Sequence, residues 1–256
     1  MRYRRPMSEK APFARAEAAR RAGDTAAARR LYAAVPRDAP MRPEACYNCG
    51  VLALDAGQPA AALVPLREAV AARPDDPDML HALGVCLRQL GRPEAALNAL
   101  RLAHAAGAAG PAAAADLAMA TGESGDWAAA AEALFADRQH WPGNARLANA
   151  HGRALAHGQA HAAAADAFRS AVALAPGFLA ARRNLAAAWQ RLGYMAEARA
   201  QWEAVLARRP DDAEARFGRA TVRLAQGDWA EGFADYEARR RLPRCVIQRV
   251  TEHLQY

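Results

Sequence analysis

Two groups of side chains have residue types and spacing suited to metal binding or redox chemistry. Cys46 and Cys49 have the CxxC spacing found in zinc sites and in redox-active disulfides. His151, His157 and His161 lie close together further along the chain. No second cysteine pair lies near the first, and no HExxH motif accompanies the histidines. The pattern favours a structural role for the cysteines, with a histidine metal site as the weaker alternative, and we expect no metal or cofactor.

Motifs for other chemistry are absent from the sequence. There is no glycine-rich phosphate loop, no GxSxG nucleophile motif and no kinase signature. The acidic residues mostly mark expected helix starts and solvated faces, without a convincing acid/base pair. The sequence therefore predicts that the protein is not an enzyme.

The composition predicts an all-α protein. Ala is the most frequent residue, whereas aromatic residues make up only 7% of the 256 residues. Ala is the best helix former and a poor strand former, which argues against a β-sandwich, a TIM barrel and a doubly wound sheet. No apolar run approaches the length of about 18 residues needed for a transmembrane segment. The charged N-terminus lacks a following apolar region, and four cysteines fit a reducing compartment, so we expect a cytoplasmic protein.

The net charge of +7 comes from one end of the chain. Residues 1–42 carry all of the excess, and residues 43–256 contain equal numbers of basic and acidic side chains. Lys10 is the only lysine, and this Arg-for-Lys bias is typical of a GC-rich genome. The charge distribution argues against a nucleic-acid partner, and RNA binding is kept only as a third hypothesis.

A 34-residue repeat organises the chain. Gly23, Gly57, Gly91 and Gly125 are each 34 residues apart, and later glycines continue this phase. Seven units follow without insertion or deletion: 9–42, 43–76, 77–110, 111–144, 145–178, 179–212 and 213–246. We expect an array over 9–243 and a disordered basic arm over 1–8. Val246, Ile247, Val250 and Leu254 have helical spacing, so 244–256 is either a capping helix or an aberrant tail.

Side-chain size follows the same repeat. Positions 8 and 20 of every unit are Ala or Gly, whereas position 24 is always large and position 32 is Pro in five units. The large residues at position 24 are Tyr32, Leu66, Leu100, Leu134, Phe168, Trp202 and Tyr236. Small residues let two helices approach closely, and the large residue fills the space beside them. Each unit is therefore expected to be a helix-turn-helix pair that buries its apolar face only against its neighbours.

This pattern resembles the tetratricopeptide repeat (TPR) over almost the whole chain. The resemblance implies an all-α, right-handed superhelical solenoid of about seven repeats. It also implies a protein–protein interaction scaffold, in which a protein or peptide partner binds the concave face. In this family the concave face is made mostly by positions 2, 5, 9, 12 and 13 of the first helix in each unit.

The fifth and sixth units place several arginines on that implied face, with no acidic residue among them. Arginine forks suit carboxylates and phosphates, so an acidic peptide is the expected ligand class, and a merely solvated wall is the alternative. The candidate peptide-binding residues are Arg146, Asn149, Arg153, His157, Arg183 and Arg191. Position 6 is Asn only at Asn48 and Asn184, so neither the carboxylate clamp nor the asparagine ladder of some TPR proteins is present.

The last unit carries a second resemblance. Gly232, Tyr236, Glu237 and Arg239 match a short segment that, in bacterial TPR proteins, precedes a C-terminal glycosyltransferase-like domain. Phe233 and Ala238 replace tryptophans of that segment. The alternative function is therefore an acceptor-recognition module of a glycosyltransferase whose catalytic domain is absent from this chain.

Overall fold

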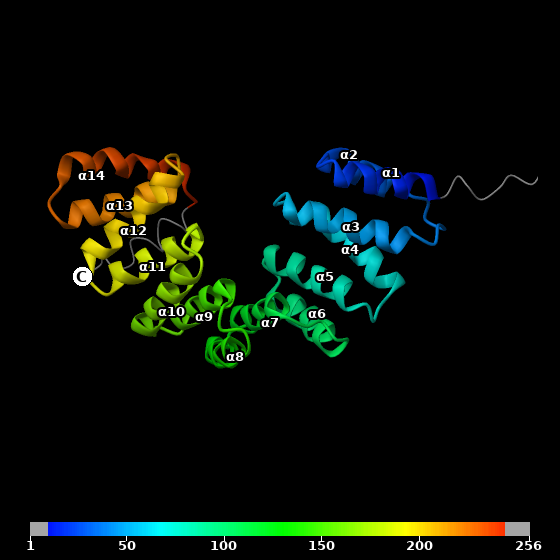
Figure 1. The fold of residues 1–256 in the computed structure, drawn as a ribbon, viewed down its shortest axis with the longest axis horizontal. Helices are drawn as coiled ribbons and strands as arrows, with labels where there is room; N and C mark the ends of the chain where they lie inside the picture. Colours follow the sequence, from blue (N-terminus) through cyan, green and yellow to red (C-terminus); the bar gives the residue numbers. More distant parts are fainter. Residues whose placement is uncertain (1–9, 244–256) are drawn as a thin grey trace, which may run out of the picture. The chain divides into compact units, whose positions relative to one another are not determined.

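The computed structural model describes residues 10–243, and within this range all regular structure is helical (Figure 1). This confirms the all-α prediction, and each 34-residue unit of the sequence contains two successive α-helices. The expected N-terminal arm and C-terminal capping helix fall outside the described residues.

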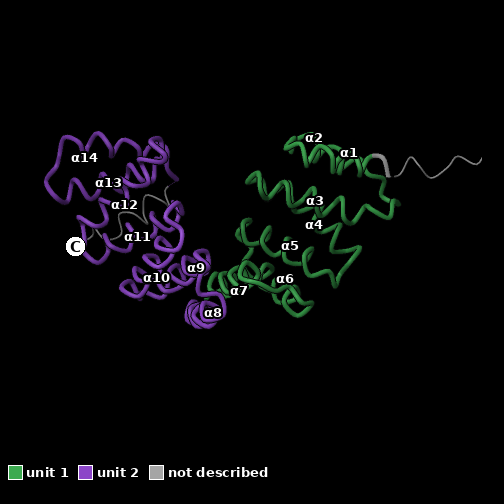
Figure 2. The backbone as a smooth tube through the Cα atoms, in the orientation of Figure 1, with its two compact units in different colours: residues 1–125 green, residues 126–256 purple. Residues whose placement is uncertain are grey.

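The chain divides into two compact units, residues 1–125 and 126–256 (Figure 2). The first contains α1 (Lys10–Arg21), α2 (Thr25–Ala33), α3 (Arg42–Asp55), α4 (Pro59–Ala72), α5 (Pro77–Gln89), α6 (Pro93–Ala105) and α7 (Pro111–Glu123). The second contains α8 (Trp127–His140), α9 (Ala145–His157), α10 (His161–Leu174), α11 (Leu179–Arg191), α12 (Met195–Arg208), α13 (Ala213–Ala225), α14 (Trp229–Tyr236) and the 3-10 helix η1 (Glu237–Arg241). Within each unit, every helix packs on the next one along the chain, as in a solenoid.

Short polar side chains begin many of the helices. Five helices start after an Asp or Asn whose side-chain oxygen accepts hydrogen bonds from backbone N–H groups of the first turn: Asp24, Asp76, Asp126, Asn144 and Asp212. These bonds satisfy donors that have no partner within the helix. The sequence thus sets where these helices begin.

Glycine ends the first helix of most repeats because the turn requires a positive φ. Gly57 and Gly91 adopt φ of 68° and 67°, a left-handed conformation that costs glycine little. The fifth repeat lacks this glycine, and Gln159 adopts the same conformation, with φ of 65°. The turn geometry is therefore imposed by the packing of α9 and α10 even where the residue type does not favour it.

The first and second helices of a repeat pack through a small residue against a large one. A Cβ atom added to Gly50, Gly84 or Gly152 would lie 2.4 to 2.6 Å from the side chain at position 24 of the same repeat. Those side chains belong to Leu66, Leu100 and Phe168, all of which are buried. Because real Cβ atoms do not approach this closely, the glycines are needed for this packing, as the size pattern predicts.

A buried polar network joins the sixth and seventh repeats. The Gln190 amide accepts a hydrogen bond from the Trp202 indole N–H and donates one to the Thr221 hydroxyl, both at 2.8 Å. Gln190 is at position 12 of its repeat and Thr221 at position 9, both of which the TPR resemblance places on the concave face. They are only 2% and 1% exposed, so for these two residues that expectation is wrong. The network satisfies the polar atoms, which would otherwise be costly to bury.

The Gln159 turn generates a stability prediction. Gln159→Gly should raise the free energy of unfolding by about 0.5–1 kcal/mol, because glycine relieves most of the left-handed strain and loses some of the gain to chain entropy. Urea unfolding followed by circular dichroism measures the change. Gly193→Gln, at a turn with φ of 82°, is the converse control and should destabilise the protein. An unchanged or lower midpoint for Gln159→Gly would contradict this account of the turn.

Candidate functional site

A cavity of about 420 Å³ lies in the second unit, where α9, α10, α11 and α13 meet. Its lining consists of Arg153, Ala156, His157, Gln159, His161, Phe168, Arg183, Asn184, Ala187, Ala188, Arg191 and Glu214. The arginines and histidines supply polar groups around it, and the alanines with Phe168 supply apolar surface. We refer to this cavity as the second-unit groove.

The groove collects four of the six candidate binding residues. Arg153 and His157 come from α9, and Arg183 and Arg191 come from α11. Asn149 is not in the lining but accepts a hydrogen bond from the Asn184 amide at 2.9 Å. The sixth residue, Arg146, is exposed near the start of α9 and is not part of the lining. The structure therefore brings together the candidate residues in the C-terminal half of α9 and those on α11.

The expectation that these arginines have no acidic neighbours is wrong for Arg183. Its guanidinium lies 3.0 Å from an oxygen of Asp212 and 3.7 Å from an oxygen of Glu214. Asp212 is the last residue of the sixth unit and directly precedes α13, and Glu214 lies in the first turn of α13 in the seventh. Asp212 also accepts a hydrogen bond from the Ala215 backbone N–H at 2.9 Å, so one carboxylate begins α13 and orients Arg183.

An aromatic contact positions the histidine at the groove. The His157 ring stacks on the Trp127 ring with centroids 4.0 Å apart and planes 9° apart. Offset stacking of this kind restricts the imidazole to one orientation. The second helix of one repeat thus positions a groove residue on the first helix of the next.

Helix α9 also carries a buried histidine that is not part of the groove lining. His151 is 7% exposed, and its Nδ1 lies 3.0 Å from a guanidinium nitrogen of Arg138. Because arginine only donates, this imidazole nitrogen accepts the bond and the ring is neutral. Burial, helped by the positive charge of Arg138, lowers the pKa of His151 to about 4. His151 therefore acts as a core residue that resists protonation.

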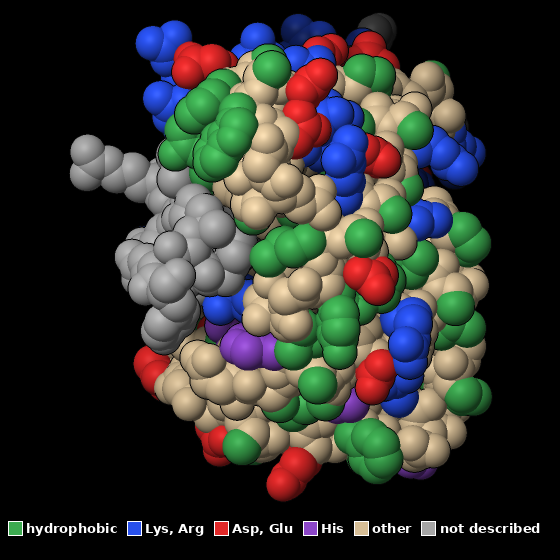
Figure 3. Space-filling model, turned by 90° about the vertical axis from the view of Figure 1, so that its left-hand side faces the viewer, with side chains coloured by type: hydrophobic (Ala, Val, Ile, Leu, Met, Phe, Trp, Pro, Cys, Tyr) green, Lys and Arg blue, Asp and Glu red, His purple; other side chains and the backbone are tan. Residues whose placement is uncertain are grey.

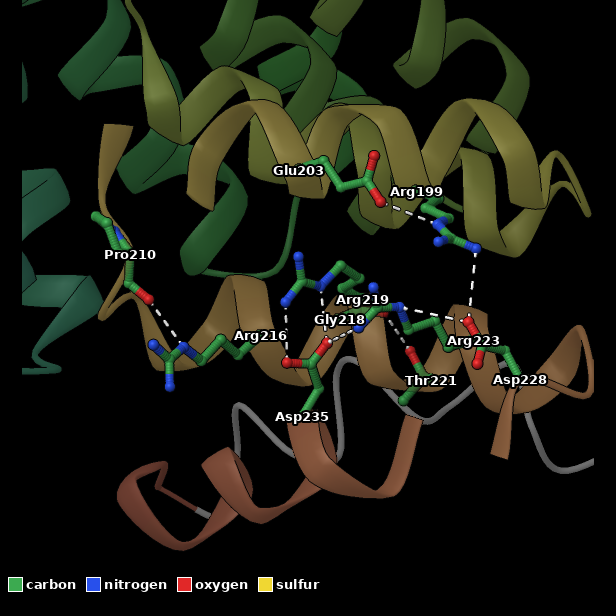
Figure 4. Close-up of polar contacts among 10 residues, drawn as sticks. All are labelled: Arg199, Glu203, Pro210, Arg216, Gly218, Arg219, Thr221, Arg223, Asp228 and Asp235. Atoms are coloured by element: carbon green, nitrogen blue, oxygen red, sulfur yellow. Dashed lines mark hydrogen bonds and ion pairs between the residues drawn. The ribbon is translucent and has the colours of Figure 1, made fainter. Parts of the chain in front are cut away.

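A second group of arginines lies between α12, α13 and α14 and is already neutralised (Figure 4). Asp235 accepts two hydrogen bonds from Arg219, at 2.7 and 2.9 Å, and one from Arg223 at 2.8 Å. Asp228 lies 3.8 Å from Arg199 and 3.7 Å from Arg223. These ion pairs hold α14 against α12 and α13. The cluster therefore has a structural role and is not a candidate ligand site.

Charge is mixed on the molecular surface as well. On the face that Figure 3 draws, basic and acidic side chains lie interspersed among neutral ones. Within residues 10–243, no three His, Cys, Asp or Glu side chains gather as a metal site would require. None of the helices described is long and apolar enough to cross a membrane.

Comparison with protein families identifies the repeat. Two tetratricopeptide repeat models match, one at residues 53–120 and the other at residues 13–77, 113–177 and 184–243. Together these matches cover well over half of the chain. The chain belongs to the tetratricopeptide repeat family. Members of this family generally act as protein-interaction scaffolds rather than as catalysts. A separate comparison with curated protein sequences found no match.

Solved structures support the same fold. A TPR protein from Parabacteroides merdae ATCC 43184 has a TM-score of 0.77 at 16% identity, with 97% of this chain and 99% of that chain covered. A chain of the APC/C hetero-tetramer Cut9-Hcn1 has a TM-score of 0.74 at 15% identity, with 94% of this chain but only 48% of that chain covered. The pilF protein of Pseudomonas aeruginosa has a TM-score of 0.64 at 18% identity, with 83% and 96% covered. At these identities the likeness shows the TPR fold alone.

The cysteines occupy core positions of the TPR array, as their place in the repeat predicts. Cys46 is 3% exposed and packs with Ala69 and Met79, whereas Cys49 is half-buried against the first repeat. Burial raises the pKa of the Cys46 thiol to about 11, which disfavours the reactive thiolate. The structural interpretation of this CxxC therefore has a physical basis.

Sequence reasoning missed several groove residues that come from outside the expected TPR face. His161 and Phe168 lie on α10, the second helix of the fifth repeat, and Gln159 lies in the turn before it. The missing turn glycine at residue 159 was a usable signal, because it marks an irregular turn beside the arginines. The Asn184–Asn149 bond was harder to foresee, because it joins different positions of adjacent repeats.

The buried histidine predicts a loss of stability in mild acid. The pKa is about 4 in the folded chain and about 6.5 in the unfolded one. The contribution of His151 is therefore complete above pH 6.5 and declines as the pH falls towards 4. Between pH 7.5 and pH 5 it should decrease by about 2 kcal/mol.

Urea unfolding at the two pH values measures this loss. The control is His151→Asn, whose amide oxygen can still accept a hydrogen bond from Arg138 but which does not titrate. The wild type should lose more stability than this variant over the same pH interval. Equal losses would show that carboxylates alone account for the acid sensitivity.

Proposed function

We propose that this TPR protein is an interaction scaffold that binds an extended acidic segment of a protein or peptide in the second-unit groove, without catalysis of its own. The observation that carries the proposal is the convergence of Arg153, Arg183 and Arg191 on one cavity of about 420 Å³. The lining holds three arginines and one glutamate, so basic side chains outnumber acidic ones around the cavity.

The remaining lining suits a peptide. Arginine forks can form two parallel hydrogen bonds with a carboxylate, which combines charge with orientation. The linked amides of Asn149 and Asn184 lie beside them and offer polar groups for a peptide backbone. Ala187, Ala188 and Phe168 provide apolar surface for the stems of glutamate side chains.

The three arginines have different tasks in this proposal. Asp212 and Glu214 hold the Arg183 guanidinium in place at the edge of the groove. They also compensate part of its positive charge. Arg153 on α9 and Arg191 on α11 line the same cavity and are the guanidiniums that would contact an acidic ligand. We also propose a cytoplasmic location, since the free thiols of Cys46, Cys49 and Cys86 suit a reducing compartment.

Paired arginine truncations test this binding site. The probe is an acidic peptide selected from a random library by the wild-type chain and titrated by calorimetry. Arg153→Ala/Arg191→Ala should weaken binding by about 1.5–3 kcal/mol for each charged hydrogen bond lost, with unchanged helicity.

The matched control removes two exposed arginines from second helices of the same unit, as Arg169→Ala/Arg208→Ala. Exposed charges contribute about 0–1 kcal/mol, so this variant should bind nearly as well as the wild type. If both double variants bind equally well, the groove is not the peptide site, although the family assignment would stand.

A further inference from the structure

The last α-helix in the described part of the chain, α14, exposes two large aromatic side chains. Trp229 and Phe233 on α14 are 60% and 58% exposed, and their rings stack with centroids 6.3 Å apart. Their apolar area is thus concentrated on one face of one helix. Contiguous exposed apolar surface of this kind is typical of an interaction site.

In earlier repeats, the equivalent helix face packs on the first helix of the following repeat. Trp229 and Phe233 occupy positions 17 and 21 of the seventh repeat. At position 17 of the fourth repeat, Trp127 stacks on His157 of the following first helix, α9. At position 21, Leu63 packs in one cluster with Ala82 and Cys86 of α5.

Other repeats use position 21 in the same way. Leu97 shares a core cluster with Ala120 of α7, and Ala165 shares one with Leu185 and Ala188 of α11. Positions 17 and 21 are thus where a second helix receives the first helix of the next repeat. In α14 these positions are filled by large aromatics that lie exposed.

The first helix of the array has the complementary face exposed. In α1, positions 6, 10 and 13 are Ala14, Ala18 and Arg21, and all three residues are exposed. The equivalent residues at positions 6 and 10 of α5 are Ala82 and Cys86, which are buried beside Leu63. The exposed face of α1 therefore carries small side chains at the positions that later first helices use for docking.

We propose that α14 of one copy docks on α1 of a second copy and continues the repeat from chain to chain. Trp229 would then lie over Arg21, as Trp127 lies over His157, which places a guanidinium on an indole face. Phe233 would pack on Ala14 and Ala18, a large residue against small ones as in the repeat cores. Different surfaces meet in such a contact, so it is heterologous and open-ended, and the degree of association depends on protein concentration.

Sedimentation and light scattering of the full chain over a wide concentration range test the association. The average mass should rise with concentration for the wild type and stay at one chain for Trp229→Glu/Phe233→Glu. The control is Val64→Glu/Leu102→Glu, which adds the same charge at exposed apolar residues of α4 and α6 and should associate like the wild type. A monomeric wild type, or equal association of all three proteins, overturns the proposal.

A mixing experiment distinguishes this contact from a symmetric one. Trp229→Glu/Phe233→Glu keeps the α1 face, and Ala14→Arg/Ala18→Arg keeps the α14 face, so each should be monomeric alone. Mixed in equal amounts, they should form a one-to-one dimer and nothing larger, because only one intact contact remains. If the arginine variant dimerises alone, or the mixture stays monomeric, the head-to-tail contact is excluded. Unchanged circular dichroism of both variants ensures that these outcomes report on docking.

Discussion

Close approach of helices through small residues is the constraint on which this structure depends. Where position 8 is glycine, as in Gly50, Gly84 and Gly152, no side-chain atom could occupy the space filled by the large residue at position 24. The same relation joins consecutive repeats at Gly218, where an added Cβ would lie 2.4 Å from the Trp202 ring. A single helix pair buries too little apolar surface to be stable alone. Each pair therefore also provides the surface on which the next pair packs.

The same packing of helices positions side chains that line the second-unit groove. Phe168 is held by Gly152 in the core of the fifth repeat and also lines the cavity. Asp212 begins α13 and contacts Arg183, so the residue that caps α13 also determines how an arginine of α11 is oriented. On α9, the stacking of Trp127 on His157 likewise orients a side chain that lines the groove. Residues that line the groove are thus oriented by contacts between different helices, both within a repeat and between neighbouring repeats.

Much of this could be predicted from the sequence, because the repeat constrains each position seven times. The turn at Gln159 and the burial of Cys46 follow from the frame alone. What the frame could not supply are contacts that depend on particular neighbours. The acids beside Arg183 lie at the start of α13, away from the first helices of the fifth and sixth repeats, and Gln190 is buried because Trp202 and Thr221 happen to satisfy its amide. Positional rules average over repeats, whereas these contacts exist in only one of them.

The central claim is that paired helix positions are matched in size, and a double-mutant cycle at Gly152 and Phe168 tests it most directly. Gly152→Ala alone should cost about 1–3 kcal/mol of unfolding free energy through overpacking, and Phe168→Leu alone should also destabilise the protein. Together they should cost less than the sum of the two, by about 0.5–3 kcal/mol, because the smaller side chain admits the added methyl group. Strict additivity in urea unfolding would contradict the account, since it would mean that the two residues do not share one packing space.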